Sequence, residues 1–174
     1  MIYEPAEDSV LILKRVKECC AGKMVLDLGT GSGILAEEAQ KCAKEVLAAD
    51  INEEAVLQVR RKGIKAVVSD LFSNVKGEFE VILFNPPYLP EEPLEDEGTR
   101  QLTTGGKLGT EIIERFLKDV KKHLASGGKI LMVTSSLTGD VEFLFRKYRF
   151  QYQRIDQKNL FFEELFLYAL WKEK

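Results

Sequence analysis

The sequence predicts an α/β fold in which helices cover both faces of a mostly parallel sheet that ends in an antiparallel hairpin. Short apolar runs alternate with segments of helical spacing along nearly the whole chain, and Gly, Asn or Asp residues separate them. Such alternation is typical of βα units, whose strands lie parallel and whose crossovers are right-handed. With 174 residues, 45% hydrophobic and 30% charged, the chain suits one domain, residues 1–174.

The first half of the chain predicts three helices and three strands. Acidic residues at Glu7 and Asp8 favour the start of a helix. Asn52 can cap a later helix, and Gly63 can end it. The expected elements are a helix from Glu7 to about Cys20, a strand Met24 to Leu28, a helix carrying Ile34 to Cys42, a strand Val46 to Asp50, a helix from Asn52 to Gly63, and a strand Ala66 to Ser69.

The second half predicts two more parallel strands, two helices and the terminal hairpin. From about Thr110, apolar residues recur at helical spacing as far as Leu124, and Gly127-Gly128 would stop that helix. His123, near its end, would interact favourably with the helix dipole. The other expected elements are strands Val81 to Asn85 and Ile130 to Thr134, a helix Gly139 to Tyr148, and hairpin strands Tyr152 to Ile155 and Leu165 to Trp171, which bring the sheet to seven strands.

Composition excludes several classes of protein. A net charge of -3 and a pI near 5.4 argue against a broad basic surface for nucleic acid. Three cysteines, Cys19, Cys20 and Cys42, with no C-x-x-C and a single histidine, argue against a disulfide framework and a metal site. We expect a reducing, cytoplasmic location, because the N-terminus does not resemble a signal peptide and no apolar run is long enough to span a membrane.

The sequence Asn-Pro-Pro-Tyr, Asn85 to Tyr88, follows an apolar run and therefore stands where a buried strand ends. Pro86 and Pro87 prevent a continuing ladder and stiffen the backbone. The Asn85 amide oxygen and the Pro86 carbonyl provide two acceptors, and Tyr88 adds a flat face. This set suits a planar substrate with an NH2 group, such as adenine, cytosine or a Gln or Asn side chain, although the segment alone also suits a simple turn.

Three further motifs follow the other predicted strands and indicate a nucleoside-containing cofactor. The loop Gly29 to Gly33 reads G-x-G-x-G, and Ile34 replaces the third glycine of a dinucleotide-binding loop, which disfavours NAD. Asp50 could accept hydrogen bonds from both ribose hydroxyls. Asp70 could accept from an adenine amino group while Leu71 covers the ring. Since parallel strands place their carboxyl ends at one edge of the sheet, we expect these motifs to meet there.

Taken together, these motifs resemble the Rossmann-like class I S-adenosylmethionine-dependent methyltransferases. Within that group the chain is similar to the HemK/PrmC-type glutamine methyltransferases of peptide-chain release factors, in particular to their short archaeal and eukaryotic branch. The resemblance runs nearly end to end. It is carried by Tyr3 to Ser9, Asp27 to Gly33, Asp50 to Asn52, Asp70-Leu71, Phe84 to Tyr88, Gly105-Gly106 and Gly109.

The resemblance implies a methyl donor, a substrate, a partner and roles for particular residues. A release factor would be the substrate, and its glutamine amide would be held at the tip formed by Asn85, Pro86, Pro87 and Tyr88. A small zinc-binding activator protein would dock at an edge strand, Ala66 to Val68, which no other strand would cover. S-adenosylmethionine would contact Ser9, Asp27, Gly29, Gly31, Asp50, Ile51, Asp70, Leu71 and Asn85.

Other interpretations remain open at this point. An N6-adenine methyltransferase for DNA or RNA would present the same NH2 donors after base flipping, but the acidic charge disfavours it. A lysine methyltransferase and a non-catalytic cofactor-binding subunit also fit the cofactor motifs. The acidic loop from Pro90 to Gly98 could act as a lid or contact a basic substrate, or simply be solvated.

Overall fold

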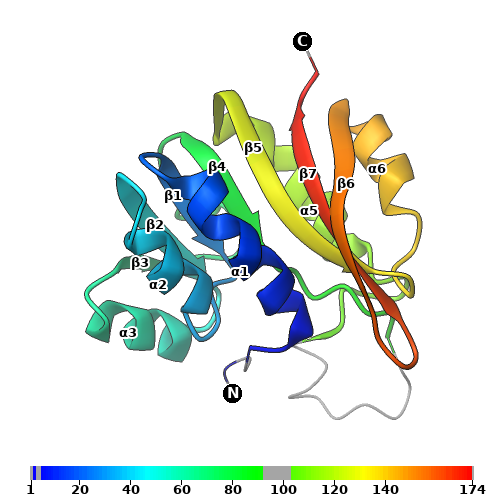
Figure 1. Ribbon diagram of the computed structural model, residues 1–174, viewed down its shortest axis with the longest axis horizontal. Helices are drawn as coiled ribbons and strands as arrows, with labels where there is room; N and C mark the ends of the chain where they lie inside the picture. Colours follow the sequence, from blue (N-terminus) through cyan, green and yellow to red (C-terminus); the bar gives the residue numbers. More distant parts are fainter. Residues whose placement is uncertain (1, 3–4, 92–102, 174) are drawn as a thin grey trace.

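In this computed structural model, which describes residues 2, 5–91 and 103–173, the chain forms one seven-stranded sheet with the strand order β3-β2-β1-β4-β5-β7-β6 (Figure 1). The first five strands in this order are parallel, and β7 runs antiparallel to both β5 and β6. The predicted α/β class, the parallel sheet and the terminal hairpin are therefore confirmed.

The strands are β1 Met24–Leu28, β2 Glu45–Asp50, β3 Lys65–Val68, β4 Phe79–Phe84, β5 Leu124–Ser135, β6 Phe150–Asn159 and β7 Glu164–Lys172. The helices with described bounds are α1 Glu7–Cys20, α2 Ile34–Gln40, α3 Glu53–Arg61, α5 Glu111–Asp119 and α6 Val141–Lys147, and a 3-10 turn, η1 Val120–Lys122, follows α5.

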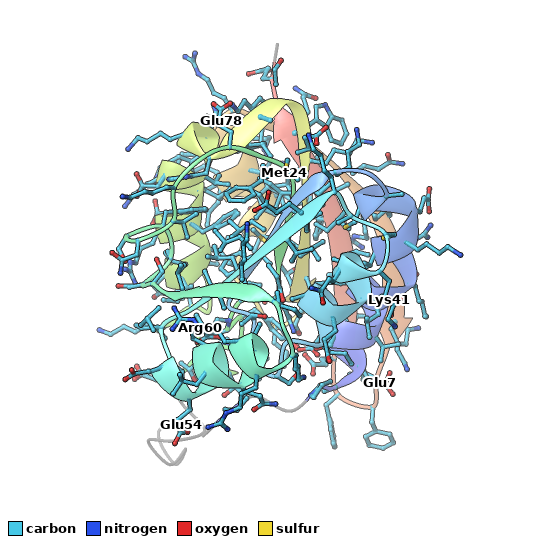
Figure 2. All side chains as sticks on the ribbon, turned by 90° about the vertical axis from the view of Figure 1, so that its left-hand side faces the viewer. Glu7, Met24, Lys41, Glu54, Arg60 and Glu78 are labelled. Atoms are coloured by element: carbon cyan, nitrogen blue, oxygen red, sulfur yellow. The ribbon has the colours of Figure 1, made fainter. Side chains whose placement is uncertain are left out.

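Two apolar layers hold the helices to opposite faces of the sheet. Buried side chains of α1, α2 and α3 pack with one set of strand residues, and those of α5 and α6 pack with the other set. Figure 2, a view toward the β3 edge, shows α1 and α2 on one side of the sheet and α5 on the other. Each face is thus buried, which explains why the central strands are apolar on both sides and leaves their carboxyl ends as the place for polar groups.

One predicted element is wrong: the helix expected to reach Leu124 ends at Asp119, and Leu124 begins the twelve-residue strand β5. Leu124 is fully buried and pairs with Phe79 of β4, so its apolar spacing reflects burial in the sheet rather than helix. Gly127 and Gly128 lie inside β5 at a register shift. Gly127 has a φ of 73°, and a Cβ on Gly128 would come within 2.9 Å of Leu124 Cδ1, so both positions favour glycine.

His123 is the C-cap of η1, which continues α5 directly, so it does stand at the end of this helical run, while its interaction with the helix dipole stays a prediction. Its ring stacks on Phe72 with centroids 4.6 Å apart, and its Nδ1 lies 3.2 Å from the carbonyl oxygen of Gly77. The histidine therefore packs against the loop between β3 and β4. The strand β6 is longer than expected and carries a register shift between Arg154 and Asp156.

Candidate active site

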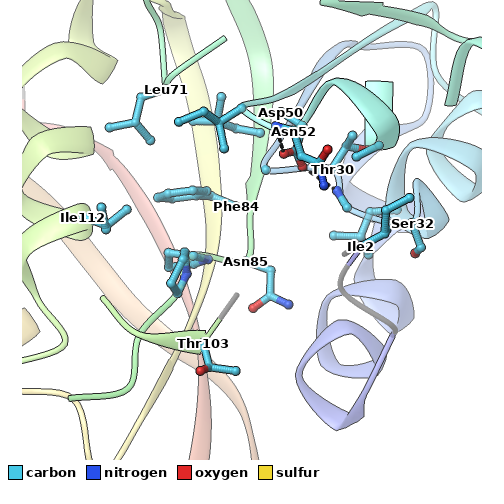
Figure 3. Close-up of a pocket in the computed structure, with 18 of the residues that line it drawn as sticks. Ile2, Thr30, Ser32, Asp50, Asn52, Leu71, Phe84, Asn85, Thr103 and Ile112 are labelled. Atoms are coloured by element: carbon cyan, nitrogen blue, oxygen red, sulfur yellow. Dashed lines mark hydrogen bonds between the residues drawn. The ribbon is translucent and has the colours of Figure 1, made fainter. Parts of the chain in front are cut away.

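A cavity of about 940 Å³ lies at the carboxyl ends of the parallel strands, where the sequence motifs were expected to meet. That volume suits a ligand of nucleoside size together with part of a second molecule. Figure 3 shows Leu71, Phe84 and Ile112 on one side of it and the polar residues around Asp50 on the other. The predicted residues that line it are Ser9, Gly29, Gly31, Asp50, Ile51, Asp70, Leu71, Asn85, Pro86, Pro87 and Tyr88.

Asp27 is the one predicted site residue that does not line the cavity. Its side chain is buried beneath the glycine loop, where Oδ2 accepts hydrogen bonds from Thr30 Oγ1 at 2.6 Å and from the backbone N–H of Ala36 at 3.0 Å. Burial raises the pKa of this carboxyl to about 6. Asp27 therefore ties the loop to the start of α2, and its direct contact with a cofactor stays a prediction.

The glycine loop is shaped by backbone geometry and by close packing. Gly29, Gly31 and Gly33 all have positive φ, between 50° and 84°. A Cβ on Gly33 would lie 2.6 Å from Val59 Cγ2, so a larger residue would push α3 away. The backbone N–H groups of Gly29 and Thr30 both donate to the carbonyl of Ala49 at the end of β2. The loop is consequently fixed against β2 before any ligand arrives.

The carboxylate of Asp50 connects the glycine loop to the start of α3. Its Oδ2 accepts a hydrogen bond from the Gly31 N–H and its Oδ1 accepts one from the Asn52 N–H, both at 2.8 Å. Each oxygen keeps further acceptor capacity, and Asp50 lines the cavity, so the carboxylate can accept from a vicinal diol. The neighbouring Ile51 side chain is 70% exposed and supplies an apolar surface beside it.

Beyond β3 the cavity wall is formed by Asp70, Leu71 and two residues of α5 that the sequence did not indicate. Leu71 adopts a φ of 47°, and its carbonyl accepts a hydrogen bond from Ser69 Oγ at 2.7 Å. Asp70 Oδ2 pairs with Arg115 Nη2 at 2.8 Å. Arg115 and Ile112 stand three residues apart on one face of α5, a spacing that could have suggested a shared surface but not its location.

Asn85 presents the most unusual polar group of the site. Its Nδ2 donates to Ser9 Oγ at 3.4 Å, while its Oδ1 is buried and has no hydrogen-bond partner among the described residues. A buried acceptor without a donor costs on the order of 1–3 kcal/mol. In Figure 3 the side chain points into the space between the apolar and polar sides of the cavity. Asn85 Oδ1 is therefore free to accept a hydrogen bond from a ligand in the cavity.

The segment that follows Asn85 is held from two sides. Gly105 donates its N–H to the carbonyl of Leu89 at 2.9 Å, and a Cβ on Gly105 would lie 2.5 Å from the Pro87 oxygen. Thr138 Oγ1 donates to the carbonyl of Tyr88 at 2.9 Å. The turn before α5 and the turn after β5 thus fix the tip, and Gly105 is required because the two backbones touch.

Asp8, in the first turn of α1, is a site residue that the sequence analysis did not single out. It lines the cavity, is only 3% exposed, and its Oδ2 accepts a hydrogen bond from Tyr88 Oη at 3.1 Å. This contact joins the start of α1 to the segment after Asn85, although the two bonded residues are 80 positions apart in the sequence. The motif from Tyr3 to Ser9 was the available signal, because it carried Asp8 next to the predicted Ser9.

Among the residues that the structure describes, no cluster of His, Cys, Asp or Glu could hold a metal ion, and no helix is long and apolar enough to cross a membrane. Cys19, Cys20 and Cys42 are free thiols. Most of the acidic loop from Pro90 to Gly98 lies outside the described residues.

Comparison with known sequences places these features in a family. Residues 6–162 match the model of the methyltransferase small domain. A Methanocaldococcus jannaschii protein named for N5-glutamine methyltransferase activity is 38% identical over 98% of this chain and 92% of its own length. Human methyltransferase HEMK2 is 30% identical over 82% of this chain and 76% of its own length. The predicted resemblance to glutamine methyltransferases is thereby confirmed.

Comparison with solved structures gives the same fold. A chain of the E. cuniculi Mtq2–Trm112 complex, which is described as responsible for methylation of the termination factor eRF1, matches with a TM-score of 0.81 and 26% identity, with 99% of both chains covered. A ribosomal protein L11 methylase from Lactobacillus delbrueckii has a TM-score of 0.75 at 22% identity, with 100% of this chain and 82% of the other covered. The second likeness concerns the fold alone.

Proposed function

This chain belongs to the methyltransferase small domain family, and we propose that it uses S-adenosylmethionine to methylate the side-chain nitrogen of a glutamine in a peptide-chain release factor. The names of its relatives favour this substrate: one is named for N5-glutamine methylation, and the solved Mtq2–Trm112 complex is described as methylating a termination factor. Two parts of the site support the proposal, namely the pocket for the methyl donor and the tip that would hold the acceptor amide.

The donor half of the cavity fits S-adenosylmethionine in shape and polarity. Asp50 would accept from the ribose hydroxyls and Asp70 from the adenine amino group, while Ile51 and Leu71 supply apolar surface for the ring. The positive-φ glycines allow backbone to approach the ligand without side chains between them. When bound, S-adenosylmethionine supplies an electrophilic methyl group on a sulfonium.

The observation that carries the proposal is the unpartnered, buried Oδ1 of Asn85. An amide nitrogen is a poor nucleophile because its lone pair is delocalised, so its orientation matters more than a strong base. Asn85 Oδ1 and the Pro86 carbonyl can accept the two N–H bonds of a primary amide, which raises the electron density on nitrogen and aims it at the methyl group. Positioning and fixed dipoles of this kind can supply on the order of several kcal/mol.

The test is methyl transfer from labelled S-adenosylmethionine to a release factor, a histone-like protein, tRNA and DNA, assayed side by side. We expect label on the release factor and on its glutamine side chain. Label on DNA or RNA would favour the adenine methyltransferase, and label on lysine would favour the lysine methyltransferase. No label on any substrate with or without the candidate activator, despite cofactor binding by calorimetry, would favour a non-catalytic subunit.

We propose further that a small zinc-binding activator protein docks at β3, the edge strand that contains Ala66 to Val68. The strand ends the sheet on this side, and Val68 is 38% exposed. Two of its outward carbonyls already have donors: Arg60 Nε bonds the Ala66 oxygen at 2.9 Å, and Asn74 Nδ2 bonds the Val68 oxygen at 2.8 Å. Figure 2 shows Arg60 beside this edge. A strand added by the partner would have to displace both side chains.

The exposed Val68 and the two bonded edge carbonyls allow specific tests of activator binding. The protein should be less soluble alone than when co-expressed with the partner, and Val68→Asp should abolish the complex while the exposed α3 control Leu57→Asp does not. Arg60→Ala with Asn74→Ala should leave the complex intact or tighten it, because the edge carbonyls become free. A soluble monomer with full activity on the release factor would contradict the activator proposal. We also propose a reducing, cytoplasmic location, which the three free thiols support.

A further inference from the structure

The turn between β6 and β7 carries two phenylalanines that the fold does not use. Phe161 is 91% exposed and Phe162 is 86% exposed, whereas Phe143, on α6, is 54% exposed. The two rings contact each other edge to face, with centroids 4.7 Å apart and an interplanar angle of 80°. A single exposed apolar residue is ordinary, but a contiguous aromatic pair at a tip is typical of an interaction site.

The turn that presents this pair is firmly attached to the end of β5. Leu160 donates its N–H to the carbonyl of Glu163 at 2.8 Å, which closes the turn. Glu163 Oε2 accepts a hydrogen bond from Ser135 Oγ at 2.5 Å, and Ser136 donates its N–H to the carbonyl of Glu164 at 2.8 Å. The aromatic pair is thus presented on an ordered support, which lowers the entropic cost of binding through it.

The segment after β5 that holds this turn also contacts the Asn85 to Tyr88 segment of the active site. Thr138 Oγ1 accepts a hydrogen bond from the Ser135 N–H at 3.1 Å and donates to the carbonyl of Tyr88 at 2.9 Å. Leu137, between these contacts, is 49% exposed. Figure 1 shows the β6–β7 turn at the end of the molecule to which the carboxyl ends of the parallel strands point. The aromatic pair therefore stands at a fixed place relative to Asn85, on the cavity side of the molecule.

Charges around the pair favour a polypeptide as its partner. Carboxylates of Glu163 and Glu164 flank the turn, and the nearby Lys158 is paired with Glu7. A nucleic-acid backbone would be repelled by this net negative surface, whereas a protein segment with apolar and basic side chains would be attracted. Because the pair lies on the cavity side of the molecule, a protein substrate whose side chain enters the site would pass close to it.

We propose that Phe161 and Phe162 form a docking anchor for the protein substrate, and that they bind an apolar surface of the release factor outside the segment that carries the acceptor glutamine. This inference rests on the proposed function. It separates two tasks within one substrate: the tip at Asn85 to Tyr88 orients the amide, and the aromatic pair at the β6–β7 turn supplies affinity for the folded protein.

The test compares Phe161→Ser/Phe162→Ser with wild type on two substrates, an intact release factor and a short peptide that contains the acceptor glutamine. For the intact factor, KM should rise about tenfold while kcat stays within about twofold, a shift typical of losing an aromatic contact at an interface. Kinetics on the peptide and the affinity for S-adenosylmethionine should not change. Phe143→Ser, which removes an exposed phenylalanine from α6, should match wild type on both substrates.

The opposite results would overturn the inference in recognisable ways. An unchanged KM for the intact factor would remove the docking role, with the proposed function still standing. Equal losses on factor and peptide, or weaker S-adenosylmethionine binding, would assign the pair a structural role instead. If sedimentation shows a wild-type dimer that the double variant cannot form, the pair binds a second copy of this chain. A wild-type enzyme that is inactive on factor and peptide alike, with the activator protein present, would instead refute the proposed function.

Discussion

The cavity has two parts that differ in how their polar groups are bonded. The donor half, around Asp50, would bind the methyl donor, and the acceptor half, around Asn85, would bind the substrate that accepts the methyl group. At the donor half, both carboxylate oxygens of Asp50 already accept backbone N–H groups, and Asp27 ties the glycine loop from below. At the acceptor half, Asn85 Oδ1 is buried without a donor in the described part of the chain. Asp27 Oδ1 is likewise buried without a hydrogen-bond partner among the described residues, but Asp27 does not line the cavity, whereas Asn85 does. The unsatisfied oxygen of Asn85 is therefore placed where a substrate can meet it. Damage to each half should therefore have different consequences.

The largest expected effect is that of Asn85→Ala on turnover. Removing the carboxamide deletes the acceptor that orients the substrate nitrogen, and loss of one preorganised group of this kind costs on the order of 10³-fold in kcat. Binding of S-adenosylmethionine, measured by calorimetry, should stay within a few-fold of wild type, because the donor half is intact. Near-normal methyl transfer by this variant would show that Asn85 does not orient the substrate.

Asp27→Asn should change the pH dependence of stability, since the carboxyl of Asp27 has a pKa raised from 3.8 to about 6 by burial. A raised folded-state pKa means that the group's contribution to stability is full below about pH 4 and is lost as the pH rises through 6, by about 3 kcal/mol in all. The asparagine variant lacks this titration. Its free energy of unfolding relative to wild type should therefore increase between pH 4 and pH 7.

Denaturant unfolding of both proteins across that pH range measures the difference. A constant difference between the two proteins at every pH would contradict the raised pKa of Asp27. Thr30→Val is a useful companion, because it removes one of the two hydrogen bonds that Asp27 accepts without removing the titrating group.

Asp50→Ala should weaken binding of S-adenosylmethionine by about 100-fold, since it removes both the ribose acceptor and the two bonds that shape the loop. Asp50→Asn keeps one acceptor oxygen and should lose less. Calorimetry gives both affinities. If Asp50→Ala binds the donor as wild type does while losing turnover, the division between the two halves of the cavity is wrong.

The smallest effect concerns the ion pair between Asp70 and Arg115, whose side chains are 46% and 50% exposed. Exposed pairs contribute at most about 1 kcal/mol, so Arg115→Ala should weaken donor binding about threefold by releasing Asp70. The effect of Arg115→Ala should vanish when Asp70 is already alanine, a non-additivity that a double-mutant cycle detects. Equal effects in both backgrounds would mean that Arg115 acts independently.

The two halves also differ in how well the sequence reveals them. Gly29, Asp50, Asp70 and Asn85 follow apolar runs directly, and parallel strands bring such positions to one edge, so their meeting at the cavity could be predicted. The place of Arg115 in the cavity wall and the hydrogen bond from Tyr88 to Asp8 could not be predicted, because both depend on how α5 and α1 pack against the sheet. Tertiary packing carries no local signal in the chain.

Tertiary packing also explains why the sequence wrongly extends the helix α5 as far as Leu124. Leu124 continues the apolar spacing of α5 because the next element is buried on the same face, and Gly127-Gly128 serves equally as a helix stop or as an irregularity inside a strand. Only the pairing of Leu124 with Phe79 decides between them.

Whether Asn85 and Pro86 hold a primary amide for methylation is tested most directly by locating the transferred methyl group. The release factor, incubated with S-adenosylmethionine and either wild-type enzyme or Asn85→Ala, is digested and analysed by mass spectrometry. We expect a single added methyl group on a glutamine side chain with the wild-type enzyme and none with the variant. A methyl group on lysine, or equal glutamine methylation by both enzymes, would contradict it.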